Sequence, residues 1–403
     1  MKPDHRIVLL VVFFVCRLSQ AQLIEGNVVD KDTKEPIPFA NVFFAGTLIG
    51  AITDLEGNFS FEIPVEGKYE LTASYVGYQG YSKQILSTDE LPFFRIELAP
   101  EVIELKDIQV EADTTGWHNN YPVFKRLFLG ETQNATSVEI INPRDIFLFF
   151  DRIENGLFAH ARKEIQVENN ALGLRMGYKM HEFRMEYKTH RFYSFGVPRF
   201  EEMIPKGKRQ AKKWNKARDK AYRGSFNHFI RSFKENTFIE EGFIVQELFR
   251  VPNPKRPPVD IIQKKLAALG VRARSSPSSI VLGASSDSDS LQYWMRMRRL
   301  PVLVDSLGKK LVDNSLFNGE SFEYKGHLKI IYSKEREDPN YEQYRRGGGI
   351  DNKQTSIVYF LDFLTIYENG YYDVEKVFFE GYMGWSLKIA EMLPIEYRPE
   401  TEP

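Results

Sequence analysis

The sequence predicts an N-terminal all-β sandwich of seven strands, followed by an α+β region with a mainly antiparallel sheet. Short runs of alternating apolar and polar residues, separated by turn residues, fill positions 22–100. This pattern is typical of a β-sandwich. A helical stretch follows at 205–236, and strand-like runs return from about Gln292. Helices set apart from an antiparallel sheet are typical of the α+β class.

The N-terminal segment has the residues that tight turns need. In the stretch 53–59, Asp54 can accept hydrogen bonds from backbone amides, and Gly57 can adopt a positive φ. Phe59, Phe61 and Ile63 then alternate on one face of the next strand. We expect such faces from two sheets to meet in one apolar layer.

A set of glycines, turn residues and strand residues recurs at characteristic spacings through the whole segment. They are Gly26, Asp30, Pro36, Ala40, Asn41, Val42, Gly46, Gly50, Thr53, Asp54, Gly57, Phe59, Val76, Gly77 and Tyr78. With this spacing, residues 22–100 resemble the carboxypeptidase-regulatory-like domain, a transthyretin-like (Ig-like) sandwich found in many Gram-negative envelope proteins. The resemblance implies an accessory, folding or docking role, sometimes with a carbohydrate-binding-like fold, rather than catalysis.

Residues 1–21 have the features of a secretory signal peptide. These features are the basic residues Lys2 and Arg6, the apolar run 7–16, and the small residues Ser19 and Ala21. Ten residues at about 1.5 Å each cannot cross a hydrocarbon core about 30 Å thick. We therefore expect an exported protein in the periplasm or associated with the outer membrane, with no transmembrane segment after cleavage.

Cys16 is the single cysteine of the chain. Val15 before it is β-branched where lipoprotein signals need a small residue, so we expect no lipid attachment. If cleavage follows Ala21, the mature chain can form no disulfide, thiolate nucleophile or cysteine-bound metal site. An exported protein of this size without disulfides fits a bacterial envelope.

The chain divides by pattern into consecutive parts. We expect a signal peptide at 1–21, the sandwich at 22–100, a linker strand and short helix at 101–136, and an α+β domain at 137–403 with a mobile loop near 271–290. The 54 Lys and Arg residues balance 55 Asp and Glu residues, giving a formal net charge of −1. This balance implies no global polyanionic partner, and export makes nucleic acid a poor candidate.

The histidines argue against a zinc peptidase. Zinc carboxypeptidases carry a similar sandwich beside a catalytic domain whose metal is held by a His-x-x-Glu pair and a distant His. None of the 7 histidines here has Glu three positions later, and His181-Glu182 does not continue as His-Glu-x-x-His. We therefore predict no catalytic residues, no metal site and no cofactor.

A basic helical stretch contains the candidate binding or structural cluster Trp214, Arg218, Tyr222 and His228. The first three residues are four positions apart and share one helix face. We expect Gly224 to end this helix and the adjacent Ser225 to cap the next one. Two interpretations stay open. The cluster binds a ligand, with the basic face meeting anionic lipid or acidic glycan, or Trp214 and Tyr222 pack on a sheet while Arg218 and His228 satisfy buried carbonyls.

Other patterns predict local features of the larger region. Period-two alternation at 172–180 shifts near His181, which predicts a bulge. Asn369-Gly370 predicts a hairpin turn, and Leu387–Leu393 predicts a short amphipathic helix. The aromatic residues Phe378, Phe379, Tyr382 and Trp385 are either core or a sugar-stacking platform.

Two functions follow from these observations. The first is a non-catalytic exported envelope protein with a binding or assembly role through its C-terminal region, whose partner is an envelope protein, a glycan or an anionic lipid. The alternative is a glycan-binding protein or an unrecognised polysaccharide or cell-wall hydrolase. Its candidate acid pairs are Glu201-Glu202 and Glu240-Glu241. Adjacent carboxylates on a strand point to opposite faces, so neither pair alone can flank a glycosidic bond.

Overall fold

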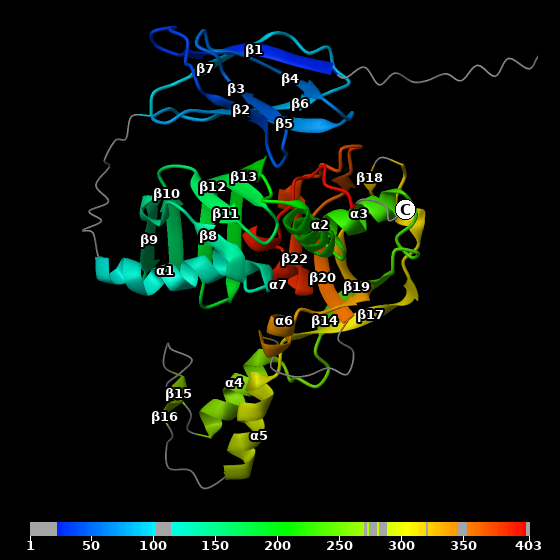
Figure 1. Ribbon diagram of the computed structural model, residues 1–403. Helices are drawn as coiled ribbons and strands as arrows, with labels where there is room; N and C mark the ends of the chain where they lie inside the picture. The colour runs from blue at the N-terminus through cyan, green and yellow to red at the C-terminus, as the bar shows by residue number, and fades with distance from the viewer. Residues whose placement is uncertain are drawn as a thin grey trace, which may run out of the picture.

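The computed structural model describes residues 22–101, 114–269, 272–273, 280–281, 288–319, 321–344 and 353–399. A sandwich lies above two β-sheets that stand side by side, and a helical arm extends below them (Figure 1). The expected signal peptide at 1–21 lies outside the described residues. So does the strand part of the expected linker, at 102–113.

The N-terminal part is a two-sheet sandwich of seven strands, so the predicted fold is confirmed. One sheet has the order β4-β1-β7 and the other β3-β2-β5-β6. Their bounds are β1 Gln22–Asp30, β2 Asn41–Phe44, β3 Gly50–Ile52, β4 Asn58–Ile63, β5 Lys68–Ser74, β6 Tyr81–Leu86 and β7 Phe94–Leu98. β1 runs parallel to β7, and the other pairs are antiparallel.

The predicted turn at Asp54 and the predicted apolar layer are both present. The Asp54 carboxylate accepts hydrogen bonds from the backbone amides of Glu56 and Asn58, and Gly57 has a φ of +78°. Phe59 and Ile63 are buried between the sheets. Local turn chemistry therefore sets the register that buries this face.

The middle sheet is built around two long strands, β12 Leu174–Glu186 and β13 Arg191–Glu202. The other edge of β12 pairs with two separate strands, β11 near its start and β10 near its end. The remaining bounds are β8 Val138–Ile140, β9 Ile146–Asp151, β10 Gly156–Ala161 and β11 Ile165–Asn169. The segment 156–169 therefore contains two strands, β10 and β11.

The helix α1, Thr114–Leu129, covers the middle sheet and buries Phe124 and Phe128 in its core. Its 16 residues exceed the short helix expected at 101–136. The predicted bulge is confirmed, because the β12–β13 register shifts between Met180 and Glu182. The extra residue, His181, keeps the apolar residues before and after it on the buried face.

The C-terminal sheet has the order β17-β14-β19-β20-β22, all antiparallel. Its bounds are β14 Phe243–Pro252, β17 Leu303–Leu311, β19 Gly326–Arg336, β20 Lys353–Phe360 and β22 Val377–Gly381. The helix α3, Phe226–Lys234, packs on this sheet through Phe226, Phe229 and Phe233. A further helix, α2 Lys208–Tyr222, precedes α3, as the sequence predicts.

Short elements complete the chain. They are β15 Arg272–Ala273, β16 Ile280–Val281, β18 Ser321–Phe322, β21 Leu364–Thr365, α6 Pro339–Tyr344, α7 Tyr382–Ser386, and the 3-10 turns at 134–137, 143–145, 314–316, 374–376 and 389–391. The Asn369-Gly370 turn is present, with a φ of +86° at Gly370, although Tyr371 is not part of a strand.

The arm consists of α4 Val259–Ala268 and α5 Ser288–Arg299. The prediction of strands from Gln292 onward is wrong at its start, because Gln292 lies within α5. Leu291 and Trp294 of α5 pack with Ile262 of α4, and this contact favours a helix over a strand. Most of the loop expected near 271–290 lies outside the described residues, and its last part is already helical.

The helix expected at Leu387–Leu393 is also wrong. The chain is extended at Lys388, and only Ile389–Glu391 form a 3-10 turn. Met383, just before, belongs to the core of the C-terminal sheet, whereas Ile389 and Ala390 belong to the core of the middle sheet. The segment must cross between two cores, and an extended chain covers that distance in fewer residues than a helix. We call residues 387–398 the C-terminal strap.

Candidate functional site

The predicted cluster lies on the corner formed by α2 and α3, where the two sheets meet. Trp214 and Tyr222 are the buried residues of α2. Apart from Arg218, its basic side chains are exposed to solvent. They are Lys208, Arg209, Lys212, Lys213, Lys216 and Lys220. The helix therefore has one face packed on the protein and one in solvent.

Trp214 and Arg218 hold the loop that connects β11 to β12. The indole Nε1 of Trp214 donates to the carbonyl of Asn170 at 2.9 Å. Arg218 Nε donates to the carbonyl of Leu172 at 2.7 Å, and its Nη2 donates to that of Gly173 at 3.1 Å. The structural interpretation predicted this role for Arg218, because a guanidinium can satisfy several carbonyls at once.

His228 lies at the start of α3, beside Tyr222. Ser225 caps this helix as predicted, since its Oγ accepts from the His228 amide at 3.2 Å. The Nδ1 of His228 accepts from the Gly224 amide at 3.0 Å, and its Nε2 lies 3.4 Å from Glu241 Oε2. His228 thus satisfies an amide and not the predicted carbonyl. Because Nδ1 is an acceptor, this network assigns the ring proton to Nε2.

We expect acid to destabilise the protein through His228. Burial lowers the pKa of His228 below its ordinary 6.5. The unfolded chain therefore takes up a proton that the native chain does not, and stability falls as pH drops below 6.5. In His228→Asn, an amide oxygen can replace Nδ1 without titrating. Unfolding midpoints from about pH 7.5 to 5.5 should then decline less steeply than in the wild type. Parallel declines would contradict this assignment.

One contact between the sandwich and the body is a short loop between β2 and β3, Gly46-Thr47-Leu48, which we call the docking loop. Lys68 and Ser74 of the sandwich make further contacts, with Asp373 and Glu164. On one side, Gly46 donates to the carbonyl of Pro198 at 2.7 Å, and Phe200 donates to that of Thr47 at 3.3 Å. Both partners lie on the free edge of β13. The docking loop therefore pairs with an edge strand, and this covers backbone groups that would otherwise be open to other chains.

The C-terminal strap bonds the other side of the docking loop. The amide of Ile395 donates to the carbonyl of Gly46 at 2.8 Å, and the amide of Leu48 donates to Glu396 Oε1 at 2.6 Å. The docking loop thus lies between β13 and the strap, with backbone hydrogen bonds to each. This arrangement fixes the sandwich on the body independently of the linker.

Arg231 of α3 holds the strap in place. Its side chain is 5% exposed. Nη1 donates to the carbonyl of Tyr397 at 2.8 Å, and Nη2 donates to the carbonyls of Asn369 and Ile395. The Asn369 amide side chain in turn donates to Lys68 of the sandwich at 2.7 Å. One buried cation therefore connects α3, the Asn369-Gly370 turn and the strap.

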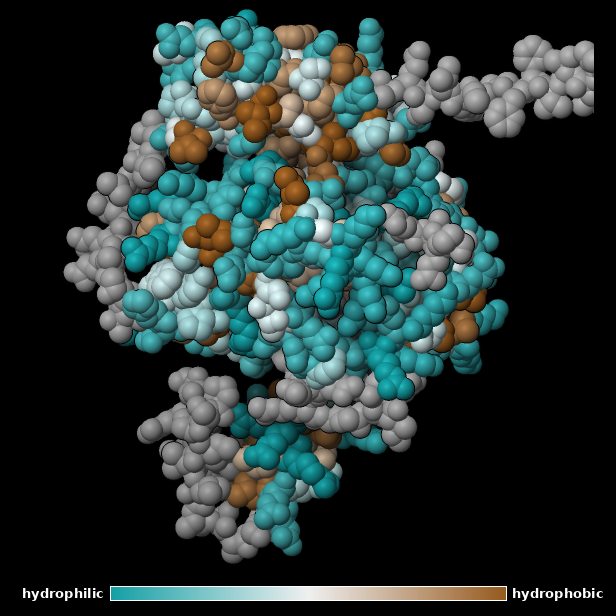
Figure 2. All heavy atoms as spheres, in the orientation of Figure 1, coloured by the Kyte–Doolittle hydropathy of each residue, from teal (hydrophilic) through white to brown (hydrophobic). Residues whose placement is uncertain are grey.

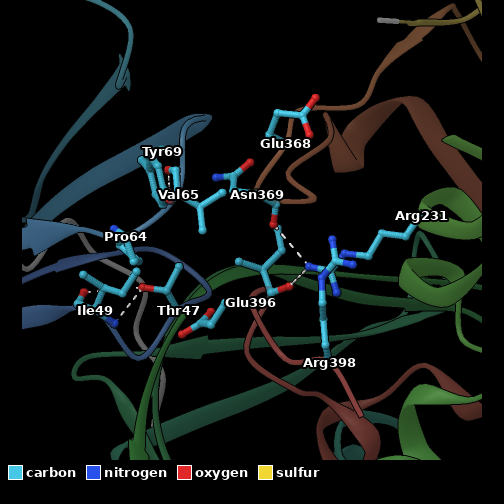
Figure 3. Close-up of a pocket in the computed structure, with 11 residues that line it drawn as sticks. Thr47, Ile49, Pro64, Val65, Tyr69, Arg231, Glu368, Asn369, Glu396 and Arg398 are labelled. Carbon is cyan, nitrogen blue, oxygen red and sulfur yellow. Dashed lines mark hydrogen bonds between the residues drawn. The ribbon is translucent and has the colours of Figure 1, made fainter. Parts of the chain in front are cut away.

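Two small cavities adjoin the docking loop. The larger, about 70 Å³, has Thr47, Val65 and Tyr69 of the sandwich on one side and Arg231 and Glu396 on the other (Figure 3). The smaller, about 30 Å³, adjoins Arg218 and the opposite side of Glu396. Ligand pockets usually measure about 300–1,000 Å³. These spaces suit a few water molecules and not a substrate.

Burial strongly shifts the pKa values of Lys388 and Glu391 of the strap. Burial lowers the pKa of Lys388 to about 8 and raises the pKa of Glu391 to about 7. Glu391 accepts a hydrogen bond from Asn134 at 3.0 Å, so it also bonds the strap to the segment after α1. Both groups favour their neutral forms because little water reaches them.

Replacing Glu391 with glutamine should stabilise the protein above neutral pH. The native pKa of about 7 exceeds the ordinary value of 4.5. The stabilisation from the bound proton is complete below 4.5 and is lost as pH rises through about 7. At about pH 8, Glu391→Gln should gain about 2 kcal/mol in urea unfolding. Lys388→Met is the matched control, and it should leave the slope between about pH 4.5 and 7 unchanged. A wild-type slope in Glu391→Gln would contradict the prediction.

Three of the four candidate hydrolase carboxylates have cationic partners. Glu201 pairs with Arg199, and Glu202 pairs with Arg218 at 2.6 Å. Glu241 contacts His228 and lies 3.8 Å from Lys334. Within the described residues, no group of three or more His, Cys, Asp or Glu side chains could hold a metal ion.

The aromatic residues 378–385 do not form one exposed platform. Trp385 is buried, and Phe379 packs edge-on against Phe226 at 5.0 Å between ring centroids. Phe378 is the exposed member. Most of this set is therefore core.

Comparison with known proteins identifies the N-terminal part. Residues 24–110 match the family model of the CarboxypepD_reg-like domain. The N-terminal sandwich is therefore a CarboxypepD_reg-like domain, as its spacing pattern predicts. No curated protein matches the chain.

One solved structure similar to the chain is that of a Bacteroides fragilis protein of unknown function, provisionally named as membrane-associated. The two share 11% identity, and the match covers 89% of this chain and 92% of that chain with a TM-score of 0.16. A likeness at this level carries no argument about function. Over the described residues, no helix is both long and apolar enough to span a membrane.

Arg231 and the strap were not predicted from sequence. Arg231 lies among the buried apolar residues Phe229, Ile230 and Phe233 of α3. A charge at such a position signals a buried partner. Its actual partners are backbone carbonyls, which have no residue-type signature, so the sequence could indicate the donor but not the acceptors.

Proposed function

We propose that this chain is a non-catalytic, exported cell-envelope protein that binds a partner and presents its CarboxypepD_reg-like domain in a fixed position. The observation that carries this proposal is the junction around the docking loop. Arg231, Asn369 and Glu396 are each hydrogen-bonded there to backbone groups of the chain itself, and the adjoining cavities measure about 70 Å³ and 30 Å³. Such a junction supports a rigid scaffold better than a catalytic cleft.

The features of residues 1–21 support export, and the absence of cysteine after position 16 fits a compartment where no disulfide is needed. The two candidate acid pairs support no hydrolase, because Glu201 and Glu202 are paired with Arg199 and Arg218, and Glu241 lies 3.8 Å from Lys334. A general acid needs a raised pKa and an open approach to substrate.

Glycan binding has one feature in its favour, a row of side chains across the middle sheet. Phe149, Phe158, Arg184 and Tyr193 are successive cross-strand neighbours. However, Phe149 and Phe158 stack on one another at 5.1 Å, and Arg184 lies 4.6 Å from the ring centre of Tyr193. Sugar rings stack on open aromatic faces, and several of these faces are already occupied. We therefore favour a protein partner.

The test begins with the location of the chain. The full sequence and a version lacking residues 2–21 are produced with a C-terminal tag in a Gram-negative host and fractionated. We expect the full sequence as a shortened product in the periplasmic or outer-membrane fraction, and the control in the cytoplasm. A full sequence retained in the cytoplasm would overturn export.

The non-catalytic part of the proposal is tested with purified protein. Peptidoglycan and soluble polysaccharides are incubated with the mature chain and with Glu241→Gln, and soluble fragments are measured. We expect no release above the buffer level from either protein. Release by the wild type that Glu241→Gln abolishes would establish a hydrolase instead.

A further inference from the structure

The end of the sandwich opposite the docking loop exposes a group of apolar side chains. Asn41 of β2 is opposite both Ile52 of β3 and Ser74 of β5. Residues just before Asn41 therefore lie at the same end of the sheet as residues just after Ile52 and Ser74. The amide of Phe39 accordingly donates to the carbonyl of Thr53 at 3.0 Å. We call Phe39, Ile52, Leu55 and Val76 the distal tip. The docking loop is at the opposite end of β2, about 20 Å away at 3.3 Å per residue.

These four side chains are among the most exposed apolar residues of the sandwich. Phe39 is 62% exposed, Ile52 64%, Leu55 67% and Val76 74%. Figure 2 shows hydrophobic residues on the surface of the sandwich above a mainly hydrophilic body. Large exposed apolar side chains gathered at one end of a domain are typical of interaction sites in soluble proteins.

Phe39 adds a separate observation, because its backbone is strained. It has a φ of +60°, and the other non-glycine residues with positive φ are Lys34, Asn155, His190 and Asn236. Polar residues tolerate this conformation more readily than a bulky aromatic does. In this conformation the Phe39 ring is exposed to solvent, so no burial in the sandwich offsets the backbone strain. Strain kept at an exposed residue is characteristic of binding sites.

The charges around the distal tip indicate the kind of partner. Four exposed acids, Asp32, Glu35, Asp54 and Glu56, flank it against two lysines, Lys31 and Lys34. Lys34 is already paired with Glu97 at 2.9 Å. An acidic rim repels the anionic surface of a bilayer and attracts lysine and arginine on a protein.

We propose that the distal tip docks a partner protein whose contact surface has an apolar centre and a basic rim. The proposal rests on the proposed function in that the partner is an envelope protein. Ser74 at the same end of the sandwich contacts Glu164 of the body at 2.9 Å, yet the four side chains of the distal tip stay exposed and can meet that partner.

The experiment places a photo-crosslinking phenylalanine analogue at Phe39 in the full chain in a Gram-negative host, after fractionation has shown where the chain resides. The matched control has the analogue at Phe378, an exposed residue on β22. We expect a discrete protein adduct at position 39 that is absent at 378 and weakens with salt. Leu55→Asp should reduce it more than about tenfold, while Phe378→Asp leaves it intact. Equal unfolding midpoints exclude misfolding as the cause.

The adduct partner must also show lysine and arginine at its crosslinked surface. A crosslink to residues 102–113 of the same chain, to a second copy, or no adduct in a correctly exported chain would overturn the proposal. So would sedimentation of purified protein with phosphatidylethanolamine–phosphatidylglycerol vesicles that Leu55→Asp abolishes. A chain that stays in the cytoplasm overturns the proposed function instead, so the two failures are distinct.

Discussion

Replacing Arg231 with alanine should lower the free energy of unfolding by about 3–5 kcal/mol. The substitution removes a buried cation and leaves the carbonyls of Asn369, Ile395 and Tyr397 without their donor. Buried acceptors without a donor carry the full cost of lost hydration. Urea unfolding measures the loss, and limited proteolysis should cut the strap near Tyr397 in the variant first.

Arg398→Ala is the matched control for Arg231→Ala. Arg398 lies on the same strap, and its partner Glu235 is as exposed as Arg398 itself. Exposed ion pairs contribute about 0–1 kcal/mol, so this variant should behave like the wild type. Equal losses from both substitutions would show that Arg231 does not hold the strap.

Gly173→Ala should be the second severe substitution. Gly173 has a φ of +66°, and a Cβ there would lie 2.2 Å from the Trp214 ring. Two costs therefore add. Alanine is strained at a positive φ, and the indole ring cannot move aside because its hydrogen bond to Asn170 fixes it. We expect a loss of about 3 kcal/mol or more in urea unfolding.

Gly46→Ala separates the two effects. Gly46 has a similar φ of +77°, but a Cβ there would meet nothing within 4 Å. This variant should therefore lose only the backbone part, about 1–2 kcal/mol. If Gly173→Ala loses no more than Gly46→Ala, Trp214 is not held against the β11–β12 loop as the structure shows.

Features that depend on neighbouring residues could be predicted from the sequence. The alternation at 172–180 and its shift at His181 predicted the bulge in β12, because one extra residue must reverse the pattern of a half-buried strand. Gly224 and Ser225 predicted the end of α2 and the cap of α3 by the same kind of short-range rule. The glycine spacing of the sandwich predicted its turns, and the family match confirmed the domain.

Long-range competition explains the errors. The stretch 387–393 has helical periodicity, but Ile389 and Ala390 are needed in the core of the middle sheet, and this contact overrides the local preference. Gln292 lies among residues that suit a strand, yet α4 supplies an apolar face for a helix. In each case, the deciding partner is distant in sequence.

The candidate cluster was predicted in position but not in detail. Trp214, Arg218, Tyr222 and His228 do gather at one corner, and Arg218 does satisfy carbonyls. The cluster's larger context, the docking loop and the strap, depends on backbone atoms. Pairing between backbone groups selects no residue type, so a single sequence contains little trace of it.

The hydrogen bond between Leu48 and Glu396 has a consequence for how the protein matures, because it joins positions 348 residues apart. A ribosome adding about 5–20 residues per second completes the sandwich on the order of 15–60 s before it makes Glu396. During that interval, the domain can fold while the groups that will anchor it do not yet exist. The arrangement is therefore assembled only after Ile395 and Glu396 have been made, and a nascent chain interrupted before them should carry a folded N-terminal domain that is not yet anchored through the docking loop.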